Sequence, residues 1–337
     1  MSVVVTMTEA HVADAGALVA ARHARERERF LLLPGAYEDS ERAAELVQGM
    51  LSFCDGVAAI DERGDLIGFL MSFESVPDPT SPIARYAPQR AAMHLVPGHA
   101  VAQHVDAGRV YAGLFGELAE RALERGVIDF IVHIPIGDPA IEAAWAAMGF
   151  GRVNLVAVRD LAPIDRPLPV DVQIRVAAPD ELDVVQQLVD EEALFHAASP
   201  MFVPYVRQQT AEAVRAELAS ALVRDDHAFL IARRDDTDIG IISIQPGLGS
   251  PLYIPDDAVY IAATAVLPGV RGSGVGAVLV DAAFAWSRDR GYRAACLHFA
   301  TANATSSSFW TGVGFTPVMA HLRRRLDERI LTNRPPV

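Results

Sequence analysis

The chain repeats part of its own sequence once, at a constant distance of 165 residues. Each copy reads as a long helix, an Arg-Gly pair, a short apolar strand and, further on, a Gly-Phe pair. The matched residues are Gly126, His133, Trp145, Gly149 and Phe150 in the first half, and Gly291, His298, Trp310, Gly314 and Phe315 in the second. One ungapped register over so many positions does not arise readily by chance. A repeat this long indicates duplicated domains rather than a solenoid.

The two copies meet at a proline-rich stretch. Residues 162–169 read Ala-Pro-Ile-Asp-Arg-Pro-Leu-Pro, and three prolines in so short a span exclude a helix and favour an extended linker. We therefore predict a first domain over residues 1–162, a linker over 163–171 and a second domain over 172–331. The length of 337 residues, 51% of them hydrophobic, fits two globular domains.

A glycine-rich turn near the end of the chain has the composition of a phosphate-binding loop. It follows a strand-like run over residues 259–266, precedes a long apolar helix, and reads Arg271, Gly272, Ser273, Gly274, Val275 and Gly276. Glycine allows positive φ and close approach of the backbone to a ligand, and free N–H groups at a helix start attract anions. A P-loop is excluded because the chain has no lysine, and the G-x-G-x-G spacing differs from the dinucleotide-binding pattern. A purely structural turn is the alternative.

This turn, together with a second motif, resembles the GNAT acyltransferase superfamily. Members carry V-x-P-x-x-R-G-x-G-x-G/A between the fourth strand and the third helix, which is met here by Val266, Pro268, Arg271, Gly272, Gly274 and Gly276. They continue with an Asn, an aromatic residue seven positions later and a Gly-Phe pair, which is met by Asn303, Trp310, Gly314 and Phe315. The resemblance implies a site for acetyl-CoA. Its cofactor-binding residues would be Ala265, Val266, Arg271, Gly272, Ser273, Gly274, Val275, Gly276, Asn303 and Trp310.

The same resemblance implies a fold and an activity. The fold would be α+β, with two tandem GNAT modules, each a mixed and mostly antiparallel sheet flanked by helices. The activity would be transfer of an acetyl group from acetyl-CoA to a primary amine of a small molecule or peptide, in the C-terminal module. The alternative is a non-catalytic acyl-CoA-binding or regulatory protein.

The first copy of the turn has lost the residues that would bind phosphate. At the 165-residue offset Asp106 stands opposite Arg271, and Arg109 and Tyr111 replace glycines. A carboxylate near a phosphate is repulsive. We therefore expect the first module to bind coenzyme A poorly or not at all, and to serve as a scaffold or as a wall of the acceptor pocket.

Three residues are candidates for the chemistry. Tyr260 occupies the strand position where relatives often place a base, although a phenol with a pKa near 10 is a weak base at neutral pH. His298 lies on the following strand and has a suitable ordinary pKa near 6.5, but His133 at the equivalent position of the degenerate copy favours a structural role. The family's usual acid is a tyrosine where this chain has Trp310, whose indole cannot deliver a proton. The hydroxyl of Ser308 could assist the leaving sulfur instead, or serve helix capping.

Two adjacent glutamates offer a further possibility. Glu191, Glu192 and the nearby His196 could bind or deprotonate a cationic acceptor, although neighbouring carboxylates on a helix more often mark a solvated face. No cluster of His, Cys, Asp or Glu has metal-ligand spacing, so we predict no metal.

Charge and hydropathy narrow the range of partners. A net charge of −14 argues against a nucleic-acid surface. No apolar run is long enough to span a bilayer and the N-terminus lacks the pattern of a signal peptide, so we expect a cytoplasmic protein without a membrane partner. The expected partner is an amine acceptor, and monomer and homodimer both stay open.

Overall fold

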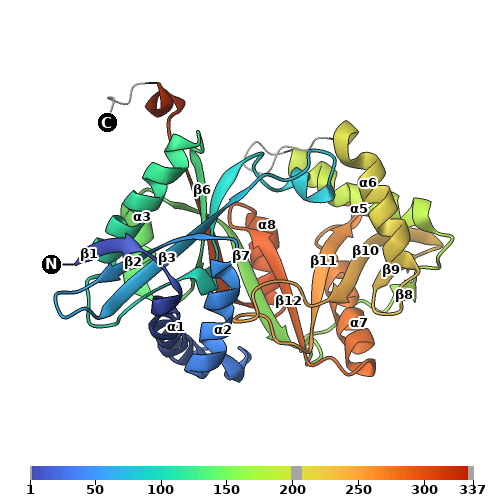
Figure 1. Ribbon diagram of the computed structural model, residues 1–337. Helices are drawn as coiled ribbons and strands as arrows, with labels where there is room; N and C mark the ends of the chain where they lie inside the picture. The colour runs from blue at the N-terminus through green and yellow to red at the C-terminus, as the bar shows by residue number, and fades with distance from the viewer. Residues whose placement is uncertain (1, 199–206, 333–337) are drawn as a thin grey trace.

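One mixed sheet runs through both halves of the protein (Figure 1). The computed structural model describes residues 2–198 and 207–332. Within these residues the sheet has 13 strands in the order β1-β2-β3-β4-β6-β13-β7-β12-β11-β10-β9-β8, and β5 pairs with β3 beside this path. Most neighbouring strands are antiparallel; β4–β6 and β11–β12 are parallel. The expected α+β class is confirmed.

The first half supplies seven of these strands in the described residues: β1 (Val3–Thr6), β2 (Asp55–Ile60), β3 (Leu66–Ser75), β4 (Ala91–His94), β5 (His99–Val101), β6 (Asp129–Pro135) and β7 (Gly151–Asp160). Its helices are α1 (Val12–Arg27), α2 (Ser40–Leu51), α3 (Ala107–Glu124) and α4 (Pro139–Ala147), with a short 3-10 turn η3 (Pro82–Arg85) between β3 and β4.

The second half supplies the rest: β8 (Gln173–Val176), β9 (Ala228–Arg234), β10 (Thr237–Pro246), β11 (Ala258–Val266), β12 (Ala294–Ala300) and β13 (Thr316–Arg325). Its helices are α5 (Leu182–Ala197), α6 (Arg207–Leu222), α7 (Val275–Asp289) and α8 (Ala304–Gly312), and the 3-10 turn η5 (Pro268–Val270) precedes the glycine-rich turn. None of the helices in the described part of the chain is long and apolar enough to cross a bilayer.

The sequence repeat is also a structural repeat. The bounds of β6, α4 and β7 become those of β12, α8 and β13 when 165 is added to each residue number. The bounds of β1 and α1 become those of β8 and α5 at an offset of 170. The chain therefore consists of two copies of one arrangement, with a small change of spacing within each copy.

The two copies exchange their last strands. Strand β13 of the second copy lies between β6 and β7 of the first, and β7 pairs on its other edge with β12 of the second copy. Figure 1 shows β7 in green beside β12 in orange at the centre of the molecule. Residues 161–172, between β7 and β8, form neither helix nor strand. Each copy's part of the sheet therefore contains a strand from the other copy. The two halves cannot separate without breaking the pairing of β7 and β13 with their neighbours.

Helices cover both faces of this sheet. Helices α3, α4, α7 and α8 contribute to one hydrophobic core, whereas α1 and α2 pack on the opposite face in another. Helix α3 packs on the sheet through one apolar stripe, because its buried Val110, Leu114 and Leu118 recur every four residues. Helices α5 and α6 cover strands of the second copy.

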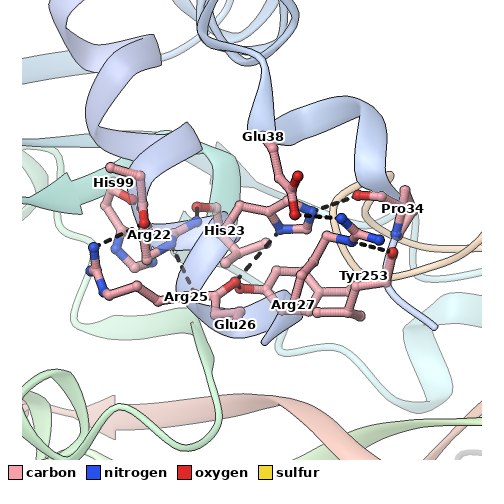
Figure 2. Close-up of polar contacts among 12 residues, drawn as sticks. Arg22, His23, Arg25, Glu26, Arg27, Pro34, Glu38, His99 and Tyr253 are labelled. Carbon is pink, nitrogen blue, oxygen red and sulfur yellow. Dashed lines mark hydrogen bonds and ion pairs between the residues drawn. The ribbon is translucent and has the colours of Figure 1, made fainter. Parts of the chain in front are cut away.

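A buried polar network also joins the two copies (Figure 2). Arg22 and Glu26 on α1 form an ion pair at 3.2 Å between Nε and Oε1. The hydroxyl of Tyr253, from the second copy, donates a hydrogen bond to the other oxygen of Glu26. All three side chains are buried, so the carboxylate is held by one partner from each copy.

Candidate active site

The glycine-rich turn lies at the start of α7, where Pro169 of the linker packs near Gly274 and Phe309 packs near Gly276. Gly272 and Gly274 have φ of +76° and +89°, which glycine adopts without strain. Arg271, Gly272 and Ser273 are exposed, and no hydrogen bond in the described residues engages the N–H groups of Gly272, Ser273 or Gly274. Those of Val275 and Gly276 belong to the first helical turn, which has no partners within the helix. Consecutive N–H groups are therefore available to an anion.

Arg271 places a fixed positive charge beside this turn. Its Nε–H donates to the Val266 carbonyl at 2.9 Å, and its guanidinium lies over the ring of Phe195 on α5, 5.0 Å from the ring centre. Both contacts orient the side chain, and its exposure leaves the remaining N–H groups accessible. The position suits a phosphate at the start of α7.

Strands β11 and β12 diverge next to the turn. They pair only from Ala258 to Tyr260 on β11, and beyond Tyr260 no described strand pairs with β11 on its β12 side. On the other side, Ala265 and Val266 pair with β10. The opening leaves a backbone edge to which an extended ligand could add as a strand would.

Tyr260 and His298 meet where the two strands part. The Tyr260 hydroxyl shares a hydrogen bond with Nδ1 of His298, and the two rings are stacked at 21°. Burial raises the pKa of Tyr260, so the phenol keeps its proton at neutral pH. Burial, with His196 nearby, lowers the pKa of His298. The His298 side chain is exposed, so a ligand can reach it.

Helix α5 places the carboxylate of Glu192 near Tyr260. Its sheet-facing stripe begins with the buried Val185 and Leu188 and continues at four-residue spacing with Glu192 and His196. Glu192 is near enough to Tyr260 to raise its pKa, and burial raises the pKa of Glu192 itself to about 8. In the described residues no hydrogen bond or ion pair engages this carboxylate. Glu192 is half-buried like Glu191, and it is the one of the two that lies near Tyr260.

The residues expected on α8 have other surroundings. Asn303 is buried and caps the helix, since its Oδ1 accepts from the Ser306 N–H at 3.0 Å. Trp310 is buried edge-on against Phe309 and Phe315 in the core. Ser308 is exposed, and no contact given for the described residues connects it with Tyr260 or His298. The structure thus brings Tyr260 and His298 together, and in the described residues no hydrogen bond, ion pair or ring contact joins this pair to the turn or to Asn303, Ser308 and Trp310.

The corresponding turn of the first copy is closed. Asp106 caps α3 by accepting from the Arg109 N–H at 3.2 Å, so a carboxylate stands where an anion would bind. Tyr111, the counterpart of Gly276, is fully buried and bonds His99 Nδ1 at 2.9 Å. A cavity of about 280 Å³ remains nearby, but Asp138 lines it and caps the adjacent helix start. This volume lies below the range typical of ligand pockets.

The opening between strands is also filled in the first copy. Arg22 donates from Nη1 to the His99 carbonyl at 2.5 Å and from Nη2 to the Val96 carbonyl at 3.0 Å. The backbone edge that stays open in the second copy is thus bonded to the protein's own side chain. Sequence reasoning missed Arg22, although the 170-residue register between α1 and α5 could have pointed to it.

Comparisons with known proteins agree with this geometry. Residues 191–315 match the model of the acetyltransferase (GNAT) family. A GCN5-related N-acetyltransferase from Sphaerobacter thermophilus superposes with a TM-score of 0.61 at 14% identity, covering 96% of this chain and 95% of that one. A tandem GNAT protein from the clavulanic acid biosynthesis pathway has a TM-score of 0.51 at 16% identity, with coverages of 96% and 98%. No curated protein sequence matches the chain. Residues 191–315 therefore match the GNAT family, and the chain shares the fold of the tandem GNAT structure over nearly its whole length, as the sequence resemblance predicted.

Proposed function

We propose that the second copy transfers an acetyl group from acetyl-CoA to a primary amine of a small molecule or peptide. The observation that carries the proposal is the open glycine-rich turn at the start of α7, placed beside the diverging strands β11 and β12. In the first copy the equivalent turn is capped by a carboxylate and the equivalent opening is filled by Arg22. The same fold therefore has one open and one closed version of the site.

The residues present fit coenzyme A. The N–H groups of residues 272–276 and the guanidinium of Arg271 would hold the pyrophosphate. The free edge of β11 near Ala265 and Val266 would pair with the amide groups of the pantetheine arm. Bound there, acetyl-CoA would supply an activated acetyl group and a thiolate as the leaving group.

His298 is the group best placed to take a proton from the amine. Its Nδ1 is engaged by Tyr260, so when Nδ1–H donates to the phenol oxygen, the Nε2 lone pair is free to accept. The lowered pKa keeps the imidazole neutral at pH 7, which a general base requires. Tyr260, whose pKa is raised, orients the imidazole rather than acting as the base itself. Ser308 stays the candidate hydrogen-bond donor to the leaving sulfur.

The first copy contributes a wall of the acceptor site. The segment between β3 and β4 reaches across to the second copy, where η3 packs against α6 (Figure 1). Tyr86, which follows η3, is near enough to Tyr260 to affect its pKa. This wall would restrict the size and direction of the acceptor.

Release of free thiol from acetyl-CoA with a panel of primary amines tests the proposal. Arg271→Ala should weaken coenzyme A binding about 10- to 100-fold, because a charge-assisted hydrogen bond is lost. The matched control is Arg109→Ala, which removes an exposed arginine from the equivalent turn of the first copy and should leave binding unchanged. Calorimetric binding without turnover on any amine would favour a non-catalytic acyl-CoA-binding protein instead. Equal losses in both variants would contradict the assignment to the second copy.

A further inference from the structure

Glu192 stands at the helix position that the first copy fills with Arg22. Helices α1 and α5 correspond at an offset of 170 residues, as do the strands that precede them. The offset pairs Arg22 with Glu192, and Glu26 with His196. Both helices turn these residues toward the opening between two diverging strands, so the two side chains can be compared directly.

In the first copy the opening is filled by a positively charged side chain of the protein itself, Arg22. The Arg22 guanidinium bonds the carbonyl oxygens of Val96 and His99 and pairs with the carboxylate of Glu26 (Figure 2). Carbonyl and carboxylate oxygens are all acceptors, so together they form a site for a positively charged donor. Arg22 fills this site, and its side chain is fully buried there.

In the second copy the built-in cation is missing. At the 165-residue offset Val96 and His99 correspond to Ile261 and Thr264 on β11, and the residue facing this strand from α5 is the acidic Glu192. Glu192 is half-buried near Tyr260, and no partner in the described residues binds its carboxylate. Desolvation without a partner raises the pKa of this carboxyl, so its position does not stabilise the folded protein.

We propose that Glu192 binds the ammonium group of the acceptor, which takes in the second copy the place that the Arg22 guanidinium takes in the first. This inference rests on the proposed acetyl transfer and deepens it by naming the substrate class. The acceptor is an amine that is cationic at neutral pH, rather than an uncharged nucleophile. Glu192 holds the ammonium ion beside His298, and the proton that the nitrogen must lose before it attacks passes to Nε2 of that histidine.

Two nucleophiles that differ in charge test whether Glu192 binds an ammonium group. At pH 9, Glu192 with its pKa of about 8 is mainly ionised, and n-butylamine is still a cation whereas hydroxylamine is uncharged. Glu192→Gln should lower kcat/KM for n-butylamine by about 10- to 100-fold, and for hydroxylamine by less than about threefold, because only the first loses a charge-assisted contact. Glu191→Gln is the matched control, since its side chain leaves the helix about 100° away, and it should leave both values within about twofold.

The result separates this inference from the proposed function. Thiol release by the unmodified protein supports acetyl transfer, and an unchanged kcat/KM for n-butylamine in Glu192→Gln then overturns the role of Glu192 alone. If no amine is acetylated, NMR titration of the unmodified protein with n-butylamine and with n-butanol decides. Tighter binding of n-butylamine that is lost in Glu192→Gln supports the ammonium site, and equal binding of the two compounds overturns it. Unchanged coenzyme A affinity in Glu192→Gln verifies that the variant is folded.

Discussion

Replacing Gly272 by alanine should weaken coenzyme A binding through the backbone alone. Gly272 has φ of +76°, and a Cβ placed there meets no other heavy atom within 4 Å, so the substitution creates no clash in the free protein. A residue with a Cβ adopts this conformation at a cost of about 1–2 kcal/mol. In the described residues no hydrogen bond engages the N–H groups of Gly272, Ser273 or Gly274, so this part of the free turn can relax to negative φ.

The size of the effect follows from that relaxation. If binding restores positive φ, the strain of about 1–2 kcal/mol is added to the free energy of binding, and the Kd for coenzyme A rises about 5- to 30-fold. Isothermal titration calorimetry with coenzyme A measures this change directly. Thermal unfolding of the same sample shows whether the fold is intact.

Two glycines serve as controls. Gly64, in the turn between β2 and β3, has φ of +90° and no heavy atom within 4 Å of a built Cβ, so Gly64→Ala carries the same strain far from the site. It should lower Tm and leave Kd unchanged. Gly108 belongs to the closed turn of the first copy, and Gly108→Ala should also leave Kd unchanged. An unchanged Kd in a folded Gly272→Ala, or the same rise in Gly64→Ala, would refute the assigned phosphate site.

Three further substitutions test individual contacts. Tyr253→Phe removes the hydrogen bond to the buried Glu26 carboxylate and should lower the free energy of unfolding by about 1–3 kcal/mol; a change below about 0.5 kcal/mol in urea titrations would contradict this. Tyr260→Phe should lower kcat about 10-fold and leave the KM for acetyl-CoA unchanged, since the phenol orients His298 without touching the cofactor; an unchanged kcat would exclude that role. Glu192→Gln should stabilise the protein increasingly as pH rises from about 4.5 to about 8, because the unfolded carboxyl ionises first, whereas the folded one keeps its proton. The upper bound of this stabilisation is about 5 kcal/mol. A difference in Tm that does not vary with pH would contradict the raised pKa of Glu192.

Much of the fold could be predicted from the sequence because the copies kept their spacing. Trp145 and Trp310 lie on equivalent helices, and both are buried in the core, as a shared packing position requires. The position of the glycine-rich turn was also predictable, since the positive φ of Gly272 and Gly274 is a local property of the chain.

Other features depend on contacts between distant residues. Glu191 and Glu192 are adjacent carboxylates, and only the packing of α5 on the sheet decides which of them lies near Tyr260. Asn303 is the asparagine of the second family motif, but in the structure its side chain caps α8. A motif shows which residues recur in a family, and the surrounding structure decides what each side chain contacts.

By itself, the sequence determined the duplication, the turn at residues 271–276 and its loss in the first copy, because repeat spacing and glycine content are local properties. Tertiary structure alone decided that β7 and β13 are exchanged, since an alternating strand pairs equally well with either sheet until long-range packing selects one. It also decided that Arg22 closes one opening while Glu192 faces the other, because both outcomes depend on how far apart two neighbouring strands lie.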